Sequence, residues 1–198
     1  RERFGGRPDF DLVEDDILKV DLPALIDRYP GHRTVVVGNI PYNITTPIIF
    51  RLLQRPRPRD VVLMVQAEVA ERMTAAVGTK AYGALSVGIR TVARVQRLFK
   101  VGRGAFRPVP KVESALVRIT PRRPEPLFLD EEVRVRKLVR ATFQWRRKQL
   151  RKILRDHPSL NLDISRVDAI LEDLGIAPEV RPENLTPESF VALSEALG

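Results

Sequence analysis

The chain has 198 residues, 43% of them hydrophobic, which is enough for one full domain and a smaller second one. It has no cysteine and only two histidines, which leaves a zinc enzyme without its usual ligands, and we expect no metal. Lysine and arginine number 34 against 25 acidic residues, and no apolar stretch approaches the roughly 20 residues of a membrane span. We therefore expect a cytoplasmic protein with a polyanionic partner and no membrane contact, a generally basic surface being the alternative.

The first 122 residues alternate between short apolar runs and helical patterns. The predicted order is strand 10–13, helix 22–29, strand 34–37, helix 46–53, strand 61–66, helix 67–77, helix 83–93, strand 95–101 and strand 114–120. Continuous β-branched runs separated by helices indicate a parallel sheet covered on both faces. The intervening residues 102–112 are too polar and proline-rich for a tight hairpin, and such loops often carry function.

The last third of the chain has a helical pattern. A proline-rich linker, PRRPEP, occupies residues 121–126. One long or kinked helix is predicted over 130–156, followed by helices over 165–174 and 187–197. We expect an α/β domain over residues 1–122 and a small all-helical domain over residues 127–198.

The segment GNIPYNITTP, residues 38–47, follows a predicted strand and is a candidate binding site. In open parallel sheets, ligands bind beyond the carboxyl ends of the strands. The residue types suit methylation of an exocyclic amine on a base. The Asn39 amide oxygen and a nearby backbone carbonyl can accept the two N–H bonds of the amine and turn its lone pair toward a methyl group. Pro41 stiffens the turn, and Tyr42 can stack on a flipped base.

This chemistry needs no strong general base, since a newly methylated ammonium loses its proton readily. A site without histidine or cysteine is therefore expected. The alternative is a plain strand-ending turn, in which Asn43 or Thr45 caps the next helix and Tyr42 packs nearby.

The stretch 134–155 contains ten basic residues and no acidic one. On a helical period, one apolar stripe forms from Val139, Phe143, Leu150 and Leu154. Another face gathers Arg136, Arg140, Arg147 and Arg151. Because this face has no counter-charges within the stretch, we expect it to contact an RNA backbone; a solvated surface is the alternative.

Six segments resemble, in order, segments of the ribosomal RNA adenine N6,N6-dimethyltransferases. They are VEDDILKVDL from Val13, GNIPYNITTPIIF from Gly38, VQAEVAERMTAAVGTKAYGALSV from Val65, FRPVPKVESALVRI from Phe106, FQWRRKQLRKIL from Phe143 and RPENLTPESF from Arg181. The resemblance implies a truncated Rossmann-like, S-adenosylmethionine-dependent methyltransferase sheet with a small helical C-terminal domain. The implied reaction is dimethylation of two adjacent adenines near the 3′ end of small-subunit (16S) ribosomal RNA, in a 30S assembly intermediate, and we expect a monomer.

The resemblance also implies roles for single residues in the base pocket. Asn39 would touch both the methyl donor and the target adenine, and the carbonyl near Pro41 would share the amine. Tyr42 would stack on one face of the adenine, and Phe106 would close the other. Phe106 could instead cover an apolar patch.

The implied cofactor and RNA contacts lie elsewhere in the chain. Asp16 would accept a hydrogen bond from the adenine amine of S-adenosylmethionine, beside the Ile17 backbone. Because EDD stands where the family has EGD, Asp15 is an alternative, and Asp16 could also be a simple turn residue. RNA contacts are expected at Arg103, Arg107, Lys111, Arg136, Arg140, Arg146, Arg147, Lys148 and Arg151.

Two other functions stay open at this point. One is a non-catalytic RNA-binding factor in ribosome assembly. The other is a methyltransferase of large-subunit ribosomal RNA that confers macrolide resistance, although FQWRRKQLRKIL and RPENLTPESF look like the small-subunit group.

We predict that these 198 residues bind S-adenosylmethionine weakly or not at all. The family's FGQNFL-like opening, its Gly-rich EIGPGxGxLT-type turn and its ribose-binding acidic residue do not occur in them. Donors and packing on one side of the ligand are therefore missing. Isothermal titration calorimetry on this chain checks the prediction, and micromolar binding would contradict it.

Overall fold

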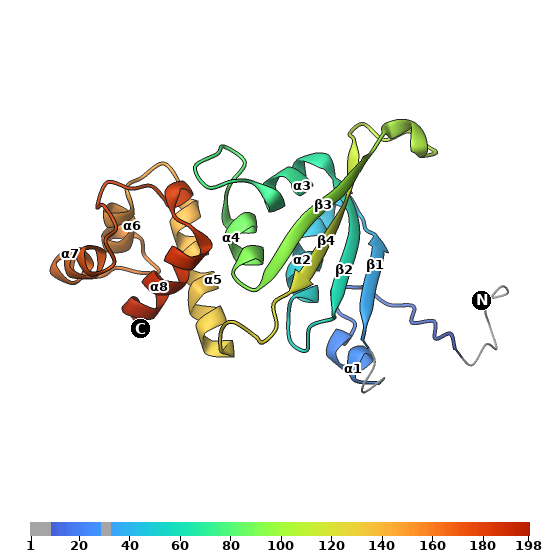
Figure 1. Cartoon of the computed structure of the whole chain (residues 1–198), viewed down its shortest axis with the longest axis horizontal. Helices are drawn as coiled ribbons and strands as arrows, with labels where there is room; N and C mark the ends of the chain where they lie inside the picture. The colour runs from blue at the N-terminus through green and yellow to red at the C-terminus, as the bar shows by residue number, and fades with distance from the viewer. Residues whose placement is uncertain (1–8, 29–32) are drawn as a thin grey trace.

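The computed structural model describes residues 9–28 and 33–198. In this part of the chain the helices are α1 (Leu22–Asp27), α2 (Thr45–Leu52), α3 (Ala67–Thr74), α4 (Ala84–Arg90), α5 (Leu129–Gln144), α6 (Leu150–Asp156), α7 (Ile164–Asp173) and α8 (Pro187–Leu197). The strands are β1 (Val35–Asn39), β2 (Asp60–Gln66), β3 (Ala93–Val101) and β4 (Ser114–Pro121), and short 3-10 turns are η1 (Tyr42–Ile44), η2 (Arg103–Ala105) and η3 (Pro182–Asn184). The molecule is elongated, with an α/β lobe (α1 to β4) at one end and a helical lobe (α5 to α8) at the other (Figure 1).

The four strands form one mixed sheet in the order β1-β2-β4-β3. β1 and β2 are parallel, whereas β4 is antiparallel to both of its neighbours. The prediction of a parallel sheet is therefore wrong for β4. The reason is the connection: β3 returns to β4 through a loop that has no α-helix, and a parallel neighbour would need a crossover.

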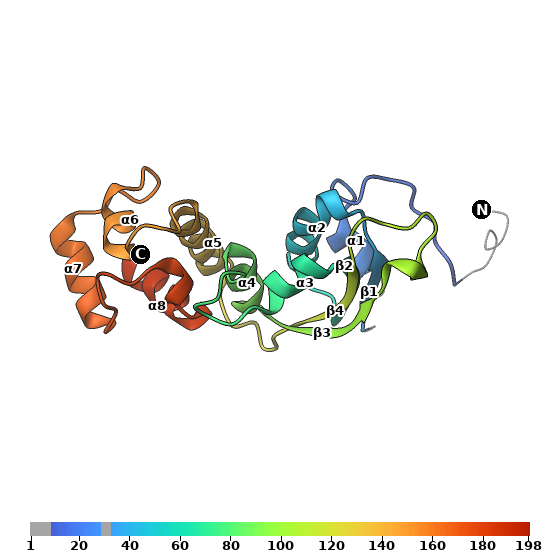
Figure 2. The same cartoon turned by 90° about the horizontal axis from the view of Figure 1, so that it is seen from above.

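Only one face of the sheet is covered by the described residues. Alternate side chains of β2 and β4 are buried in a core shared with α2 and α3. Helices α2 and α3 lie on the same side of the sheet (Figure 2). On the other face, Val35 and Val37 of β1 are 47% and 76% exposed. The prediction of a sheet covered on both faces is therefore wrong here, because an apolar run alone does not show whether its second face is packed.

Several predicted elements change in extent. No strand forms at 10–13, where Phe10 is 41% and Leu12 54% exposed. This segment does not join the sheet, in which β1 pairs with β2 only among the described residues. The predicted helix 22–29 ends at Asp27, and Tyr29 lies outside the described residues.

The predicted long helix 130–156 is two helices. α5 ends at Gln144 and α6 begins at Leu150. Near the break, the Thr142 hydroxyl donates to the carbonyls of Leu138 and Val139, a bond that competes with regular helix continuation. The predicted apolar stripe is nevertheless confirmed, since all four of its members contribute to the core of the helical lobe.

That second core crosses the predicted domain boundary. Tyr82, from the connection between α3 and α4, is fully buried in it, and its hydroxyl donates to the Leu185 carbonyl at 2.8 Å. Burial raises the pKa of Tyr82 to about 12. Val87 of α4 is buried in the same core. The domain boundary at residues 122–127 stays a prediction. Side chains from the α/β lobe pack in the core of the helical lobe.

A buried ion-pair cluster joins the two lobes. Arg57, after α2, is fully buried; its Nη2 donates to Glu132 Oε2 of α5 at 2.5 Å, and it also pairs with Glu125 in the linker. Arg55 and Arg136 bond the same Glu132 carboxylate at 2.6 and 3.0 Å. Burial by itself would raise the pKa of Glu132, but the guanidinium groups of Arg57 and Arg55 outweigh it and hold that pKa below its usual range.

We predict that Glu132→Ala lowers the free energy of unfolding by about 3–5 kcal/mol, because it leaves buried Arg57 without its main partner. Urea denaturation of the variant measures this loss. Asp130→Asn is the matched control, because Asp130 pairs with Arg134 at an exposed site on the same turn of α5 and little change is expected there. Equal losses in both variants would contradict the prediction.

Candidate functional site

The carboxyl ends of β1, β2 and β3 lie along the same end of the sheet, which we call the sheet edge. Gln66, which ends β2, pairs with Ser114 at the start of β4. Val101, which ends β3, pairs with Ser114 from the other side. The turn after Asn39 and the 102–113 loop therefore leave the sheet at the same edge, and Figure 1 shows this loop projecting beyond it.

The turn after β1 leaves Asn39 exposed at the end of its strand. The Pro41 carbonyl is already occupied, since it accepts from the Ile44 N–H and from the Thr45 hydroxyl, both at 3.3 Å. The Ile40 carbonyl accepts no turn or loop hydrogen bond from the described residues. No side chain caps α2, so the capping roles considered for Asn43 and Thr45 do not occur. Of the two carbonyls, that of Ile40 is therefore the one without a hydrogen bond from the described turn and loop residues.

The Tyr42 ring is held from across the sheet edge. Its hydroxyl lies 2.6 Å from the Ser114 hydroxyl, and Ser114 is fully buried. The Ala67 N–H at the start of α3 donates to the Glu113 carbonyl at 2.9 Å, which fixes the end of the loop beside it. Sequence reasoning missed Ser114, because only the register of β2 and β4 brings it to the Tyr42 turn.

Phe106 lies in the projecting loop, half-buried at the end of η2. Its N–H donates to the Arg103 carbonyl at 3.3 Å, and Arg107 Nη1 donates to the Phe106 carbonyl at 3.1 Å. Within residues 9–28 and 33–198, no ring contact joins Phe106 to Tyr42. The structure thus places Phe106 at the same edge as Tyr42 without bringing the two rings together. The side chains of Arg103, Arg107 and Lys111 are exposed.

Asp16 builds a turn in this structure. One of its carboxylate oxygens accepts from the Leu18 N–H at 2.9 Å, and its carbonyl accepts from the Lys19 and Val20 N–H groups. The Asp15 carboxylate accepts from the Asp16 N–H at 2.7 Å. Ile17 is half-buried and packs on the core of the α/β lobe. The turn interpretation of Asp16 fits these contacts, which leave one Asp16 carboxylate oxygen for a ligand amine.

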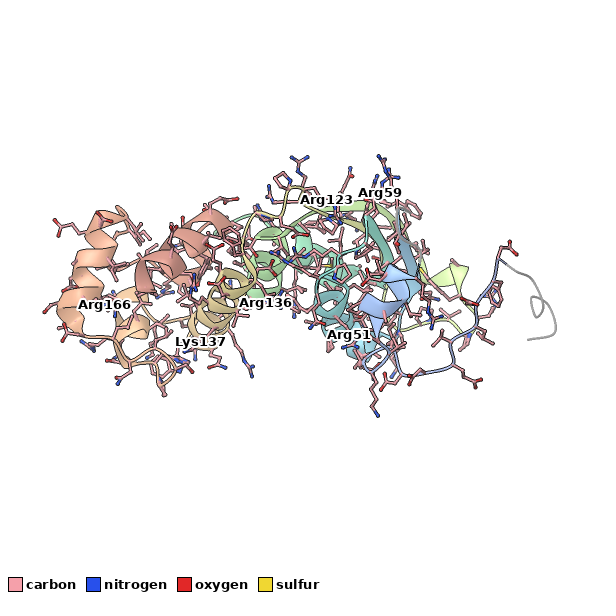
Figure 3. All side chains as sticks on the ribbon, turned by 90° about the horizontal axis from the view of Figure 1, so that it is seen from below. Arg51, Arg59, Arg123, Arg136, Lys137 and Arg166 are labelled. Atoms are coloured by element: carbon pink, nitrogen blue, oxygen red, sulfur yellow. The ribbon has the colours of Figure 1, made fainter. Side chains whose placement is uncertain are left out.

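Arg51 of α2 holds the turn that contains Asp16 against the α/β lobe. Its Nη2 donates to the Val20 carbonyl. Figure 3 labels Arg51 on the α/β lobe. The predicted cofactor residues therefore sit on a segment that is held in place by a long-range hydrogen bond.

The arginines of the basic stretch find acidic partners outside residues 134–155. Arg151 forms two hydrogen bonds with Asp168 of α7, at 2.5 and 2.6 Å, and these raise the pKa of Arg151. Arg136 bonds Glu132, and Arg146 donates to the carbonyls of Lys80 and Thr79. Glu132 precedes Arg136 by one turn of α5, whereas Asp168, Lys80 and Thr79 come from other segments, so the local sequence does not reveal those three.

The remaining predicted RNA contacts of this stretch are exposed. Arg147 and Lys148 lie between α5 and α6, and Arg140 lies on α5. None of the three forms an ion pair with another described residue. The break between the helices separates Arg147 from the face that a continuous helix would share with Arg140.

We predict that the hydroxyls of Tyr42 and Ser114 are energetically coupled. Tyr42→Phe and Ser114→Ala should each lower the free energy of unfolding by about 0.5–1.5 kcal/mol, and the double variant should lose less than the sum. Urea denaturation of the four proteins gives the coupling. Strictly additive losses would show that this hydrogen bond does not hold the ring.

Comparison with known proteins places the chain in a family. A family model described as Ribosomal RNA adenine dimethylase matches residues 1–197. A curated relative named Ribosomal RNA small subunit methyltransferase A, from Hahella chejuensis, is 40% identical over 98% of this chain and 68% of its own length. Its namesake from Levilactobacillus brevis is 41% identical over 93% of this chain and 64% of its own length. The chain therefore spans about two thirds of these relatives.

Two solved structures share the fold. A dimethyladenosine transferase from Plasmodium falciparum has a TM-score of 0.70 and 31% identity, over 80% of this chain and 65% of that one. The 23S rRNA methyltransferase ErmE has a TM-score of 0.69 and 28% identity, over 100% of this chain and 75% of that one. These neighbours confirm the predicted Rossmann-like methyltransferase fold. Across residues 9–28 and 33–198, no acidic or histidine cluster is suited to a metal ion and no helix could cross a membrane. By its match over residues 1–197, the chain belongs to the ribosomal RNA adenine dimethylase family.

Proposed function

We propose that the protein dimethylates the N6 amines of two adjacent adenines near the 3′ end of small-subunit ribosomal RNA, with S-adenosylmethionine as the methyl donor. The observation that carries this proposal is the Asn39 to Tyr42 turn at the carboxyl edge of the sheet, braced by Ser114, in a chain of this family. The names of the curated relatives support the small subunit as the source of the RNA. The partner is then an assembling 30S particle.

We assign to this turn the orientation that the reaction needs. The Asn39 side-chain oxygen and the Ile40 carbonyl accept the two N–H bonds of the adenine amine, which frees its lone pair from conjugation with the ring. We assign Tyr42 to stacking on the base, and the bond between its hydroxyl and Ser114 supports this by restraining the ring. Phe106 reaches the opposite face of the base when RNA draws the loop in.

The methyl donor supplies an electrophilic methyl group. The amine nitrogen held by Asn39 and Ile40 would take this methyl group, and the electron pair of the broken bond would stay on the donor. The ammonium that results then loses a proton to water, so no side chain has to act as a strong base. Asp16 fits the donor through its second carboxylate oxygen, which can accept from the adenine amine of the donor beside the Ile17 backbone.

Exposed basic residues occur on both lobes and support contact with an RNA backbone. Near the site, these are Arg103, Arg107 and Lys111, and on the helical lobe they are Arg140, Arg147 and Lys148. Arg136, Arg146 and Arg151 instead hold parts of the protein together. We therefore assign phosphate contacts to the first six.

These basic residues would equally serve a non-catalytic RNA-binding assembly factor. Methyl incorporation into unmodified small subunits separates the two functions, since a pure binder would show tight, salt-sensitive binding without incorporation.

The fold shared with a 23S rRNA methyltransferase favours a second candidate target, large-subunit RNA. Mapping the modified adenines distinguishes the two RNAs.

We predict that Asn39→Ala in the full-length gene product lowers methyl incorporation into unmodified small subunits by at least about 100-fold, because the amine is no longer oriented. RNA affinity should stay unchanged. Asn43→Ala is the matched control, because Asn43 is an exposed residue of the same type four positions along the same turn. Equal incorporation by the two variants would rule out the role of Asn39.

A further inference from the structure

A pocket of about 470 Å³ lies between the two lobes, away from the Asn39 turn. Its lining is mostly apolar and includes Phe50 of α2, Ala84 and Gly88 of α4, and Phe143 of α5. Arg136 and Arg140 of α5 also border it. Figure 2 shows α4 and α5 side by side where the lobes meet. No residue assigned above to the target adenine or to the methyl donor lines this pocket.

The pocket presents one aromatic ring from each lobe. The Phe50 ring lies against α4 because Gly88 has no side chain there: a Cβ at position 88 would be 2.9 Å from Phe50 Cε1. Phe143 is held by rings of the second core, with centroid distances of 6.3 Å to Tyr82 and 5.8 Å to Phe190. Both phenylalanines are half-buried and well supported. Flat aromatic ligands are favoured by such surfaces.

The rim of the pocket is positively charged. Arg140 is exposed and forms no ion pair with another described residue. Arg136 belongs to the buried cluster, in which three arginines surround the two carboxylates of Glu125 and Glu132, so one positive charge is left over. Figure 3 shows Arg136 and Lys137 on α5. An apolar cavity with cationic groups at its rim complements a ligand that is aromatic at one end and anionic at the other.

We propose that this pocket receives an unpaired base of the substrate RNA, which stacks on Phe50 or Phe143 while a neighbouring phosphate contacts Arg140. The proposal rests on the RNA substrate proposed above and adds a second nucleotide site, remote from the target adenine. The volume lies within the range of roughly 300–1,000 Å³ that holds small ligands, and a nucleoside fits it. A base in this place bridges α2 and α4 to α5, so RNA binding also clamps the two lobes together.

Two variants separate the base from the phosphate. Ala84→Leu fills the pocket without changing the charge, and Arg140→Gln removes the charge at the rim. Their matched controls on α7 are Ala169→Leu, at an exposed alanine, and Arg166→Gln, at an exposed arginine. The dissociation constant for unmodified small subunits is measured for the full-length gene product over a range of salt concentrations. Thermal unfolding by circular dichroism verifies that each variant is folded.

We expect Ala84→Leu to weaken binding about 5- to 160-fold, the range for loss of one stacked base, with an unchanged salt dependence. Arg140→Gln should reduce the slope of log K against log salt by about 0.7–0.9, the contribution of one phosphate contact. Both controls should bind like the wild type. Ala84→Leu binding as tightly as Ala169→Leu would overturn the proposal, even if Arg140→Gln binds weakly.

The same assay separates this proposal from the proposed function. If the wild type methylates small subunits and Ala84→Leu binds them normally, only the pocket proposal fails. If the wild type neither binds nor methylates them, the proposed substrate is wrong, and the pocket loses its ligand with it.

Discussion

The relation between the two lobes depends on the carboxylate of Glu132. Three guanidinium groups meet it, one from the helix that carries it and two from the loop after α2. A buried cluster of this kind gains its stability only when every member is present, since each lone charge would be costly in the interior. The linker, the start of α5 and the end of α2 are therefore fixed against one another, and with them the distance between the sheet edge and the basic residues of the helical lobe.

At the sheet edge, contacts between distant segments likewise hold the candidate site residues in place. A transferase that acts on a weak nucleophile gains its rate from orientation, and orientation requires rigid neighbours. Ser114 holds Tyr42, and Arg51 holds the turn that contains Asp16. Neither supporting residue is expected to touch a reactant. Each forms a polar contact with a segment far away in the chain, and this contact positions the groups that are expected to touch a reactant.

Much of this arrangement could be predicted from the sequence. The position of the Asn39 turn at the end of a strand and the apolar stripe from Val139 to Leu154 both follow from local patterns. Antiparallel β4, Ser114 under Tyr42 and Asp168 beside Arg151 could not be predicted, because each depends on pairing between distant segments. The arginine face failed for a related reason: a period of 3.6 residues holds only while the helix continues, and α5 ends at Gln144.

The burial of Tyr82 and Val87 among the side chains of the helical lobe has a consequence for folding. By its position in the sequence, the segment between α3 and α4 belongs to the α/β lobe. Its Tyr82 side chain nevertheless packs in the core of the helical lobe. Loss of the helical core would therefore remove packing partners from this segment of the α/β lobe. We therefore expect backbone amides around Tyr82 and α8 to exchange with solvent through one shared opening rather than through separate local ones.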